Sequence, residues 1–476
     1  MALKQKVEET SSDSKKRKRV VFAKIDSGVG ANECIKVFLV RSQDEVGATS
    51  SICIEPVDLN HFFGEDGKIY GYKDLKINIW LSTISFHAYA EISFESTQDG
   101  GKGITDLKPA LQSIFGESLI EKEEFLQTFS KECDYIRNIV SHGTVIDCDT
   151  FNGGHPSDTH LDAEGSTVEV IRMEMQSMPV GVLYSRLVPL VLLLVEGGRP
   201  IDITDPRWEI FLVVKKTQGS STNCTVQLLG FATLYCFYHY PDSSRLRISQ
   251  ILVLPPYQSQ GHGRHLLEAV NSVAVSENIY DITIEDPSDY LQNLRACIDT
   301  CRLLTFEPIK TAIDAVVSSL KERNLSKTNC KASMKPPSTA IEIARQKLKI
   351  NKKQFLRCWE VLIYLTLDPQ NSRCMNNFRA CISDRMKSDI LDKDAQSNGK
   401  RLIEVPNDYG LDTTFVVFWS MANGEVDSLA GMLEGDQPTQ EHQLNILVDT
   451  QIEEITDIAR KVSLLCNTEE GKTGHF

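Results

Sequence analysis

The segment with the clearest chemical potential is a glycine-containing loop, Gln258–Gly263. It follows a strand-like apolar stretch, Leu246–Leu254, and leads into an apolar helical pattern that runs to about Ser276. Glycine lets backbone N–H groups approach an anion closely. The first N–H groups of a helix lack helical partners and lie at the positive end of its dipole. This order of strand, tight loop and helix therefore predicts a pyrophosphate-binding site.

Two widespread phosphate-binding motifs do not fit this loop. The P-loop pattern GxxxxGK[ST] requires a Lys that does not follow here, and the dinucleotide pattern GxGxxG requires a third glycine and a later acidic residue. The loop has glycines only at Gly261 and Gly263. What remains is the pattern QxxGxG, which begins at Gln258 and opens an apolar helix.

Carboxylates that could act as a general base lie at Glu285 and Asp286, directly after the strand-like stretch Tyr280–Ile284. Side chains alternate along a strand, so we expect Glu285 on the face opposite Ile282 and Ile284. A carboxylate in such a place could take a proton from an attacking amine. Taken by themselves, these residues favour an ordinary strand-ending turn, and a catalytic pair is the alternative.

The whole chain is acidic and long enough for several domains. Its 476 residues carry a formal net charge of -14, and 41% of them are hydrophobic. This length predicts two or three domains, and this hydrophobic content indicates packed cores. The acidic balance argues against direct DNA binding, because the phosphate backbone selects for basic surfaces. It suits a basic partner, although solubility is the more general explanation of an acidic surface.

The cysteines and the polar N-terminal residues indicate a reducing compartment. The chain has 13 cysteines, and its first residues contain no apolar signal-peptide core. Cys297 and Cys301 have a spacing that is more often helix packing than metal binding, and there is no CxxC pair, so no metal is expected. No apolar run reaches the roughly 18 residues of a membrane span, and no membrane association is expected.

Hydrophobic periodicity predicts mixed strands and helices as far as residue 306 and mainly helices beyond it. Strands are expected at Cys34–Val40, Lys76–Leu81, His87–Phe94, Val168–Met175, Trp208–Lys215, Val226–Phe237 and Thr414–Trp419, besides those that flank the loop. Helices are expected at Ile104–Phe115, Lys122–Phe129, Gly181–Val195, Ile341–Ile350, Lys353–Leu367 and Ile452–Leu465. Residues 147–166 are expected to form a loop, Gln218–Asn223 a hairpin turn, and residues 385–405 a polar linker.

In this setting of strand and helix, the QxxGxG loop resembles the coenzyme A loop of the GCN5-related N-acetyltransferase superfamily. A longer stretch, Arg247–Leu267, together with Asp281–Ser288, resembles the type B histone acetyltransferase catalytic subunits. Other segments that resemble this family are His61–Tyr72 with Asp74–Ile77, Ile201–Asp202 with Trp208 and Phe211–Val213, Tyr235–Arg247, and Lys349–Lys352. The resemblance covers residues 30–370, and it assigns no role to the acidic loop 153–165.

This resemblance implies an α+β fold: a mixed sheet flanked by helices, with an N-terminal α/β domain and a C-terminal helical region. It divides the chain into a disordered basic tail (1–19), an N-terminal histone-binding domain (20–160), an acetyl-CoA-binding acetyltransferase domain (161–312), a C-terminal helical domain (313–384), and a linker with a C-terminal extension of unknown role (385–476).

The resemblance also implies a mechanism, with acetyl-CoA as co-substrate and no metal. The substrate lysine attacks the thioester directly in a ternary complex, after it has lost a proton to a carboxylate. The catalytic carboxylates implied are Glu285, which we expect to be the base, Asp286 and Glu196. The residues implied to hold acetyl-CoA are Ile251, Leu252 and Val253 in the strand, and Gln258, Ser259, Gln260, Gly261, His262 and Gly263 in the loop.

The substrate implied is the N-terminal tail of newly synthesised, non-nucleosomal histone H4. Glu65 and Asp66 on the N-terminal loop are expected to bind the tail, and Tyr235 and Phe237 are expected to line its groove. Gly67 stands where the family can carry a further acidic residue. Phe237 lacks a hydroxyl that relatives carry, so its side chain cannot make the hydrogen bond that such a hydroxyl would make.

A WD40-repeat histone-binding chaperone of the retinoblastoma-associated type is the partner implied, with histone H4 bound alone or together with H3. The nucleus and the cytoplasm are both expected, because the family acetylates histones before deposition. The basic run Lys15–Arg19 is typical either of a nuclear import signal or of a solvated tail. Two alternatives stay open: a non-catalytic histone chaperone that keeps the fold, and an acetyltransferase for another protein amine.

Overall fold

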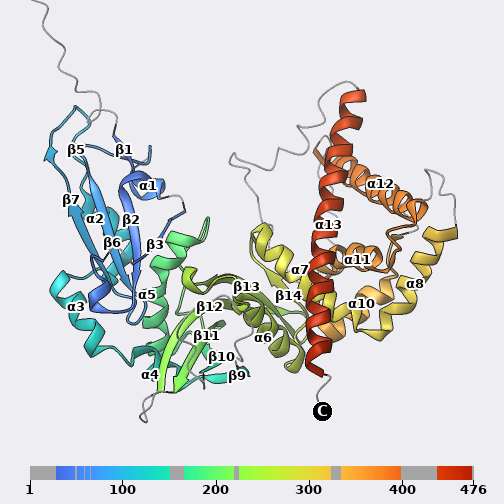
Figure 1. Cartoon of the computed structure of the whole chain (residues 1–476), viewed down its shortest axis with the longest axis horizontal. Coiled ribbons are helices and arrows are strands. Elements are labelled where there is room, and N and C mark those ends of the chain that lie inside the picture. The colour runs from blue at the N-terminus through green and yellow to red at the C-terminus, as the bar shows by residue number, and fades with distance from the viewer. Residues whose placement is uncertain are drawn as a thin grey trace, which may run out of the picture. The chain divides into compact units, whose positions relative to one another are not determined.

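The computed structural model describes residues 28–48, 51–57, 59–64, 66–150, 166–218, 224–322, 334–397 and 437–473. These residues form two compact units (Figure 1). The first unit contains the described residues up to Tyr135, together with Val182–Ile201. The second unit contains Ile136–Gly181 and the described residues from Asp202 onward. Helix α5, Met178–Leu194, has residues in both units.

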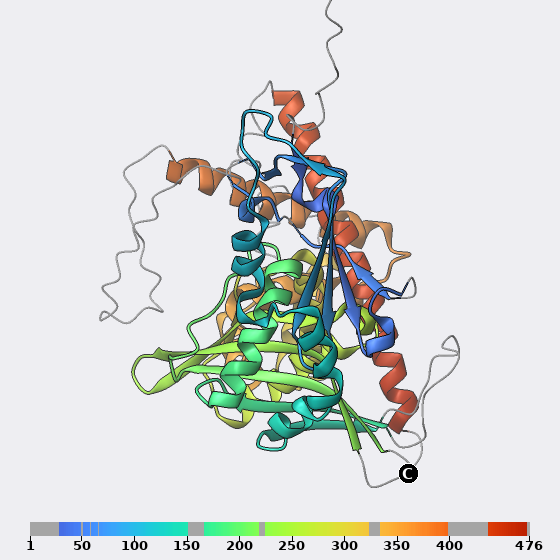
Figure 2. The same cartoon turned by 90° about the vertical axis from the view of Figure 1, so that its left-hand side faces the viewer.

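The first unit is built on a four-stranded sheet in the order β3-β2-β6-β7, drawn in blue in Figures 1 and 2. Its strands are β2 (Ile35–Val40), β3 (Ile52–Ile54), β6 (Lys76–Ser82) and β7 (Ala88–Ser93). Strands β2 and β6 are parallel, and the other two pairs are antiparallel. The helices among its described residues are α1 (Ala31–Cys34), α2 (Leu107–Phe115), α3 (Lys122–Lys131) and most of α5. Two short ribbons, β1–β4 (Val29–Gly30, Lys68–Ile69) and β5–β8 (Tyr72–Lys73, Ser96–Thr97), flank the loop at Asp66.

The second unit contains a six-stranded sheet whose spatial order follows the chain, from β9 to β14. Its strands are β9 (Thr144–Thr150), β10 (Ser166–Glu174), β11 (Trp208–Gln218), β12 (Cys224–His239), β13 (Ser243–Val253) and β14 (Ile282–Ile284). All neighbours are antiparallel except β13 and β14, which are parallel. Helix α6 (His262–Ser276) covers one face through a shared apolar core that includes Val213, Leu246, Ile248, Leu266 and Val270.

A short helix, α4 (Tyr135–Val140), precedes β9. The helices that follow β14 along the chain form a second apolar core. They are α7 (Asp289–Leu304), α8 (Glu307–Glu322), α10 (Ser338–Leu348), α11 (Lys352–Thr366), α12 (Ser372–Ser397) and α13 (Gln437–Thr473). Trp359 and Phe355 of α11 are almost completely buried at its centre. Helix α13, drawn in red in Figure 1, packs against α7, α11 and α12 and contributes Val448, Ile455 and Val462 to this core.

The α+β fold predicted from the sequence is confirmed, and most of the expected elements occur within a few residues of their predicted bounds. Two expectations are wrong. Residues 147–150 were expected to form a loop, but they extend β9, which pairs with β10. Residues 385–397 were expected to be linker, but they continue α12. Strand β9 is stabilised by pairing with β10, and Arg385 of α12 forms an ion pair with Glu360, 25 residues earlier in the chain. Local composition does not report such contacts.

Four other expectations fall wholly or mainly on residues outside those that the structure describes. These are the basic run Lys15–Arg19, the acidic loop 153–165, the hairpin turn Gln218–Asn223 and the strand Thr414–Trp419. The first domain was expected to end at residue 160. In the structure, β9 joins the sheet of the second unit, and residues 182–201 belong to the first unit.

Candidate active site

Strand β13 carries the central irregularity of the site, a β-bulge at Ser249. Thr233 of β12 is opposite Gln250 and Leu234 is opposite Ile248, so Ser249 is the extra residue. An extra residue reverses the order in which side chains point to the two faces. Before the bulge Leu246 and Ile248 pack toward α6, and after it Ile251 and Val253 do so.

The same strand separates from its neighbour beyond the bulge. Strand β14 pairs only with Leu246, Arg247 and Ile248. Among the described residues, no strand pairs with Ile251–Val253 on the β14 side. The backbone of this segment therefore faces an interrupted edge of the sheet, where an extended amide-bearing ligand could take the place of a strand.

The loop after β13 has the geometry of an anion site. Helix α6 begins after Gly261, which has a left-handed backbone with φ of 90° and provides no side-chain cap. Ser259 also has a positive φ, of 61°. Gln258 donates a hydrogen bond from Nε2 to the carbonyl of Val253 at 3.0 Å, which joins the loop to the end of β13. The loop thus presents the positive end of the α6 dipole directly beside the interrupted edge.

His262, in the first turn of α6, is buried. Burial lowers its pKa to about 4, and the neighbouring charges of His265 and Lys215 add to this effect. The imidazole is therefore neutral at pH 7, so the positive potential at the loop comes from the helix rather than from this side chain.

Glu285 lies at the end of β14 and is exposed. Its backbone N–H donates to the carbonyl of Ile248 at 2.9 Å. Its carboxylate oxygen Oε2 accepts a hydrogen bond of 2.8 Å from the hydroxyl of Ser249. The bulge residue thus orients the carboxylate, and Ile282 and Ile284 pack on the opposite, α6 side as alternation predicted. Asp286 is also exposed and has a positive φ of 33°.

Aromatic and basic side chains share the face of the sheet that carries Glu285. The rings of Trp208 and Tyr235 are 4.7 Å apart, and those of Tyr235 and Phe237 are 4.5 Å apart. The guanidinium of Arg247 lies 4.5 Å from the ring of Phe237. We call Trp208, Tyr235, Phe237, Arg247 and Glu285 the Glu285 face. Its half-buried rings suit the apolar stem of a lysine, and its carboxylate suits the amine.

Tyr235 is fixed within this face by an acidic neighbour. Its hydroxyl donates to Asp205 Oδ2 at 2.9 Å, and Asp205 also pairs with Arg207 at 2.7 Å. Burial and the hydrogen bond to Asp205 raise the pKa of Tyr235. The pKa of Asp205 lies below its ordinary value because Arg207 bonds its carboxylate. The tyrosine is therefore a neutral, oriented donor at neutral pH.

Contacts from the helical core hold strand β14 on its outer side. Ile282 forms a bridge with Ile350, and its N–H donates to the carbonyl of Lys349 at 3.1 Å. The carbonyl of Ile282 accepts from Asn351 Nδ2 at 2.8 Å and from Arg295 Nη2 at 2.7 Å. The position of the strand that ends in Glu285 therefore depends on residues far along the chain.

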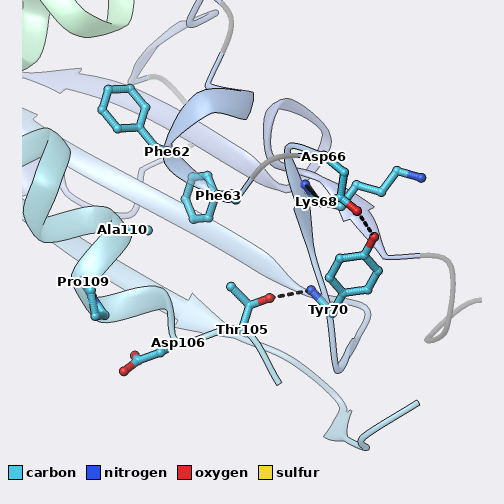
Figure 3. Close-up of a pocket in the computed structure, with 10 residues that line it drawn as sticks. Phe62, Phe63, Asp66, Lys68, Tyr70, Thr105, Asp106, Pro109 and Ala110 are labelled. Carbon is cyan, nitrogen blue, oxygen red and sulfur yellow. Dashed lines mark hydrogen bonds between the residues drawn. The ribbon is translucent and has the colours of Figure 1, made fainter. Parts of the chain in front are cut away.

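The other predicted site residues lie in the first unit. Glu196 is exposed, two residues beyond the end of α5, and Glu65 is outside the residues that the structure describes. Asp66 is exposed and lines a cavity of about 360 Å³ (Figure 3). Phe62, Phe63, Tyr70, Thr105 and Asp106 also line this cavity. Tyr70 donates a hydrogen bond to Asp66, as the figure shows, and this bond lowers the pKa of the carboxyl.

Lys102 provides a basic partner for Asp66 within the same unit. Its amine lies 3.5 Å from Asp66 Oδ2 and donates to the hydroxyl of Tyr70 at 2.9 Å. It also lies 4.5 Å from the centre of the Tyr70 ring. This acidic and aromatic loop thus holds an internal lysine in the manner in which it could hold a basic side chain of a peptide.

Sequence reasoning missed three residues of the site: Ser249, Arg247 and Trp208 were not proposed to act in it. For Ser249 a signal was present, because Ser249 and Gln250 are consecutive polar residues that end the alternating stretch Arg245–Ile248. Such a break is typical of a bulge. Arg247 and Trp208 show no local signal, since their roles follow from pairing between strands.

Two negative findings concern only the described part of the chain. There, no group of three or more His, Cys, Asp or Glu side chains is placed to hold a metal ion. In the same residues, no helix combines the length and apolarity that a membrane crossing requires.

Two family models match the chain. The one described as "Histone acetyl transferase HAT1 N-terminus" matches residues 27–196, and the one described as "Acetyltransferase (GNAT) family" matches residues 202–296. The chain is 57% identical over 471 residues to a histone acetyltransferase type B catalytic subunit from Zea mays, covering 98% of each chain. It is 48% identical to the Arabidopsis thaliana protein of the same description, covering 95% of this chain and 96% of that one. For the Rattus norvegicus protein the identity is 29%, over 75% of this chain and 79% of that one.

Proposed function

Because the chain belongs to the family of type B histone acetyltransferase catalytic subunits, we propose that it acetylates the N-terminal tail of newly synthesised, non-nucleosomal histone H4. The acetyl group comes from acetyl-CoA and is transferred to lysine ε-amino groups. The observation that carries this proposal is the arrangement around the Ser249 bulge. The interrupted strand edge begins there, the carboxylate of Glu285 accepts a hydrogen bond from Ser249, and the N-terminus of α6 follows the end of the same strand.

The residues proposed to bind acetyl-CoA fit the chemistry of this co-substrate. The backbone of Ile251, Leu252 and Val253 lies at the interrupted edge, where the amides of the pantetheine arm can pair as a strand would. The loop Gln258–Gly263 and the N-terminus of α6 suit the pyrophosphate. Acetyl-CoA supplies the acetyl group as a thioester. These contacts orient it along β13, toward the bulge at Ser249.

Glu285 is the proposed general base. A lysine amine has an unperturbed pKa of about 10.4 and is protonated at neutral pH, so a proton must leave before the nitrogen can attack. The Glu285 carboxylate accepts this proton, directly or through water, while Ser249 holds its Oε2. The amine nitrogen bonds to the acetyl carbon, the carbon–sulfur bond breaks, and coenzyme A leaves as a thiolate that takes up the second proton lost by the nitrogen. Asp286 and Glu196 are the further carboxylates proposed to assist.

The histone tail is proposed to use both the Glu285 face and the N-terminal loop. Tyr235 and Phe237 present half-buried rings beside Arg247, which suit the methylenes of a lysine. In the first unit, the carboxylate of Asp66 already pairs with the amine of Lys102, which supports an affinity for basic side chains. A tail residue would exchange with Lys102 at this position. Glu65 is the second acidic residue proposed for this contact.

The proposed partner is a WD40-repeat histone-binding chaperone that presents H4 alone or with H3. The net charge of -14 suits assembly with basic histones. The nucleus and the cytoplasm are both proposed locations, since the basic run Lys15–Arg19 can be read by import receptors. Deletion of residues 1–19 is expected to reduce the nuclear fraction of the protein, measured by cell fractionation. An unchanged distribution would contradict the import signal.

The proposed activity is tested by incubating the full chain with acetyl-CoA and either free histones or assembled nucleosomes. Mass spectrometry then locates the new acetyl groups. We expect acetylation of the free H4 tail and little on nucleosomes. Equal acetylation of both would contradict the preference for non-nucleosomal histone.

Calorimetry with acetyl-CoA separates the alternatives. Binding without transfer to any histone would point to another protein amine as substrate or to a requirement for the partner. No binding of acetyl-CoA would favour a non-catalytic histone chaperone.

A further inference from the structure

The C-terminal helix α13 is an integral part of the unit that carries the candidate active site. Its residues Val448, Ile455 and Val462 are at most 2% exposed, and they belong to the same apolar core as residues of α7 and α11. Helix α7 begins directly after the turn that follows Glu285, with Ser288 as its N-cap. Helix α13 therefore packs on α7, the helix that begins three residues after Asp286.

A chain of polar contacts runs from α13 to this turn. Glu454 of α13 forms an ion pair with Arg357 of α11. Arg357 Nη1 donates to Gln292 Oε1 of α7 at 3.0 Å. Gln292 Nε2 in turn donates to the carbonyl of Pro287 at 3.1 Å. Pro287 is two residues beyond Glu285.

The direction of these contacts is set by chemistry. A guanidinium only donates hydrogen bonds, so the atom of the Gln292 amide that faces Arg357 must be its oxygen. The amide nitrogen must then point toward the carbonyl of Pro287. Arg357 also donates from Nη2 to Asn293 Oδ1 at 2.9 Å, which prevents the guanidinium from rotating away. The Gln292 side chain is thereby held in one orientation.

The turn needs such support because its backbone is strained. Asp286, between Glu285 and Pro287, has a φ of 33°, a region that residues other than glycine rarely adopt. Strained conformations of this kind persist only where surrounding contacts hold them. The hydrogen bond from Gln292 is one of the contacts that do so.

We propose that Glu454, Arg357 and Gln292 are positioning residues, through which helix α13 fixes the turn that carries the Glu285 carboxylate. This inference rests on the proposed role of Glu285 as the base. The three residues contact neither substrate nor acetyl-CoA in this proposal. They act by keeping Glu285 at the distance from Ser249 that the structure shows.

The variant that tests the last step is Gln292→Glu. A carboxylate still accepts from Arg357, so the link between α7 and α11 stays, but it cannot donate to the carbonyl of Pro287. Glu454→Gln tests the first step, because it removes the charge that holds Arg357. The matched control is Asp449→Asn, on the same helix, which breaks only the ion pair with Arg379 of α12.

The measurements are kcat, the KM for acetyl-CoA and the melting temperature, each from pH 7 to about 9.5. Misplacement of a catalytic group can cost up to about 100-fold in rate. We expect Gln292→Glu to lower kcat about tenfold at pH 7 with little change in KM or melting temperature. The defect should shrink as the pH rises toward the pKa of the substrate amine, since the base then matters less. Asp449→Asn should match the unmodified chain.

Glu285→Gln is measured in parallel to separate the two proposals. If Glu285→Gln is impaired and Gln292→Glu is not, the positioning role is overturned and Glu285 remains the base. If Glu285→Gln has normal turnover, the assignment of the base fails, and the positioning role fails with it. A defect of Gln292→Glu that is equal at every pH, or that comes with a lower melting temperature, would show a structural role only.

Discussion

The two faces of the sheet at β13 and β14 differ in what their side chains do. On the α6 face, Leu246, Ile248 and Ile282 are buried against α6. On the Glu285 face, Arg247 and the aromatic rings are only half-buried, and Glu285 is exposed. The difference shows that the two faces of this pair of strands have separate roles. Apolar contact on one face stabilises the fold, and the other face leaves groups accessible to a substrate.

The bulge at Ser249 is where this division changes along β13. Up to Ile248 the even-numbered residues pack toward α6, and from Ile251 the odd-numbered residues do so. The bulge also marks the point where pairing with β14 stops. Substitutions on either face therefore test whether stability and activity are separable here.

The largest effect is expected for Glu285→Gln on the Glu285 face. Loss of a general base typically lowers the rate by 100- to 10,000-fold, so we expect kcat to fall about 1,000-fold. The amide can still accept a hydrogen bond from Ser249, and the residue is exposed, so the melting temperature and the Kd for acetyl-CoA should stay unchanged. Assays stopped at set times and read by mass spectrometry measure kcat, and calorimetry measures the melting temperature and the Kd for acetyl-CoA. A clear loss of stability would break the proposed division between the faces.

A large effect on stability is expected for Leu266→Ala on the α6 face. This side chain is fully buried, and such truncations typically cost about 3 kcal/mol of unfolding free energy. The fraction that remains folded at low temperature should keep its kcat. Urea unfolding measures the free energy of unfolding, and kinetics at 10 °C or below measure kcat. Val275→Ala, on the exposed side of the same helix, is the control and should change little.

A smaller effect is expected for Ser249→Ala, which removes the hydrogen bond that orients Glu285. A hydrogen bond to a charged group contributes about 1.5 kcal/mol or less when its acceptor is accessible to water, so kcat should fall about fivefold to tenfold. Ser249→Thr, which keeps the hydroxyl, should recover part of the rate. Equal losses in both variants would indicate that the bulge geometry matters and the hydroxyl does not.

The smallest effect concerns the pH dependence of stability on the α6 face. Burial lowers the pKa of His262 from 6.5 to about 4, so the unfolded chain binds its proton at a higher pH than the folded chain does. The stability that this neutral histidine preserves is present above pH 6.5 and is lost as the pH falls toward 4. We expect the melting temperature of His262→Gln to decrease less between pH 7 and pH 5 than that of the unmodified chain. Parallel decreases would contradict this contribution.

Much of the site could be predicted from local patterns. The loop Gln258–Gly263 and the helix after it occur as expected, because glycine placement and helical periodicity are properties of a short segment. The position of Glu285 opposite Ile282 and Ile284 also follows from alternation within one strand. The assignment to acetyltransferases from these motifs is confirmed by the family matches. The roles of Glu285, Asp286 and Glu196 stay predictions.

Other features depend on residues that are distant in sequence. Strand β9 and the long helix α13 were missed or underestimated, because each is stabilised by its packing rather than by its own composition. The same holds for the contact between Gln292 and Pro287, which is oriented by Arg357, 65 residues further along the chain.

The sequence by itself determined most of the local elements, the conformation of the loop Gln258–Gly263 as the start of a helix, and the face on which Glu285 lies. The tertiary structure alone decided where β13 separates from β14, which residues form the Glu285 face, and which side chains connect α13 to the turn after Glu285. The physical reason is the range of the interactions. Periodicity and turn geometry act within a few residues, whereas strand register and helix packing depend on which distant segments share hydrogen bonds and a core.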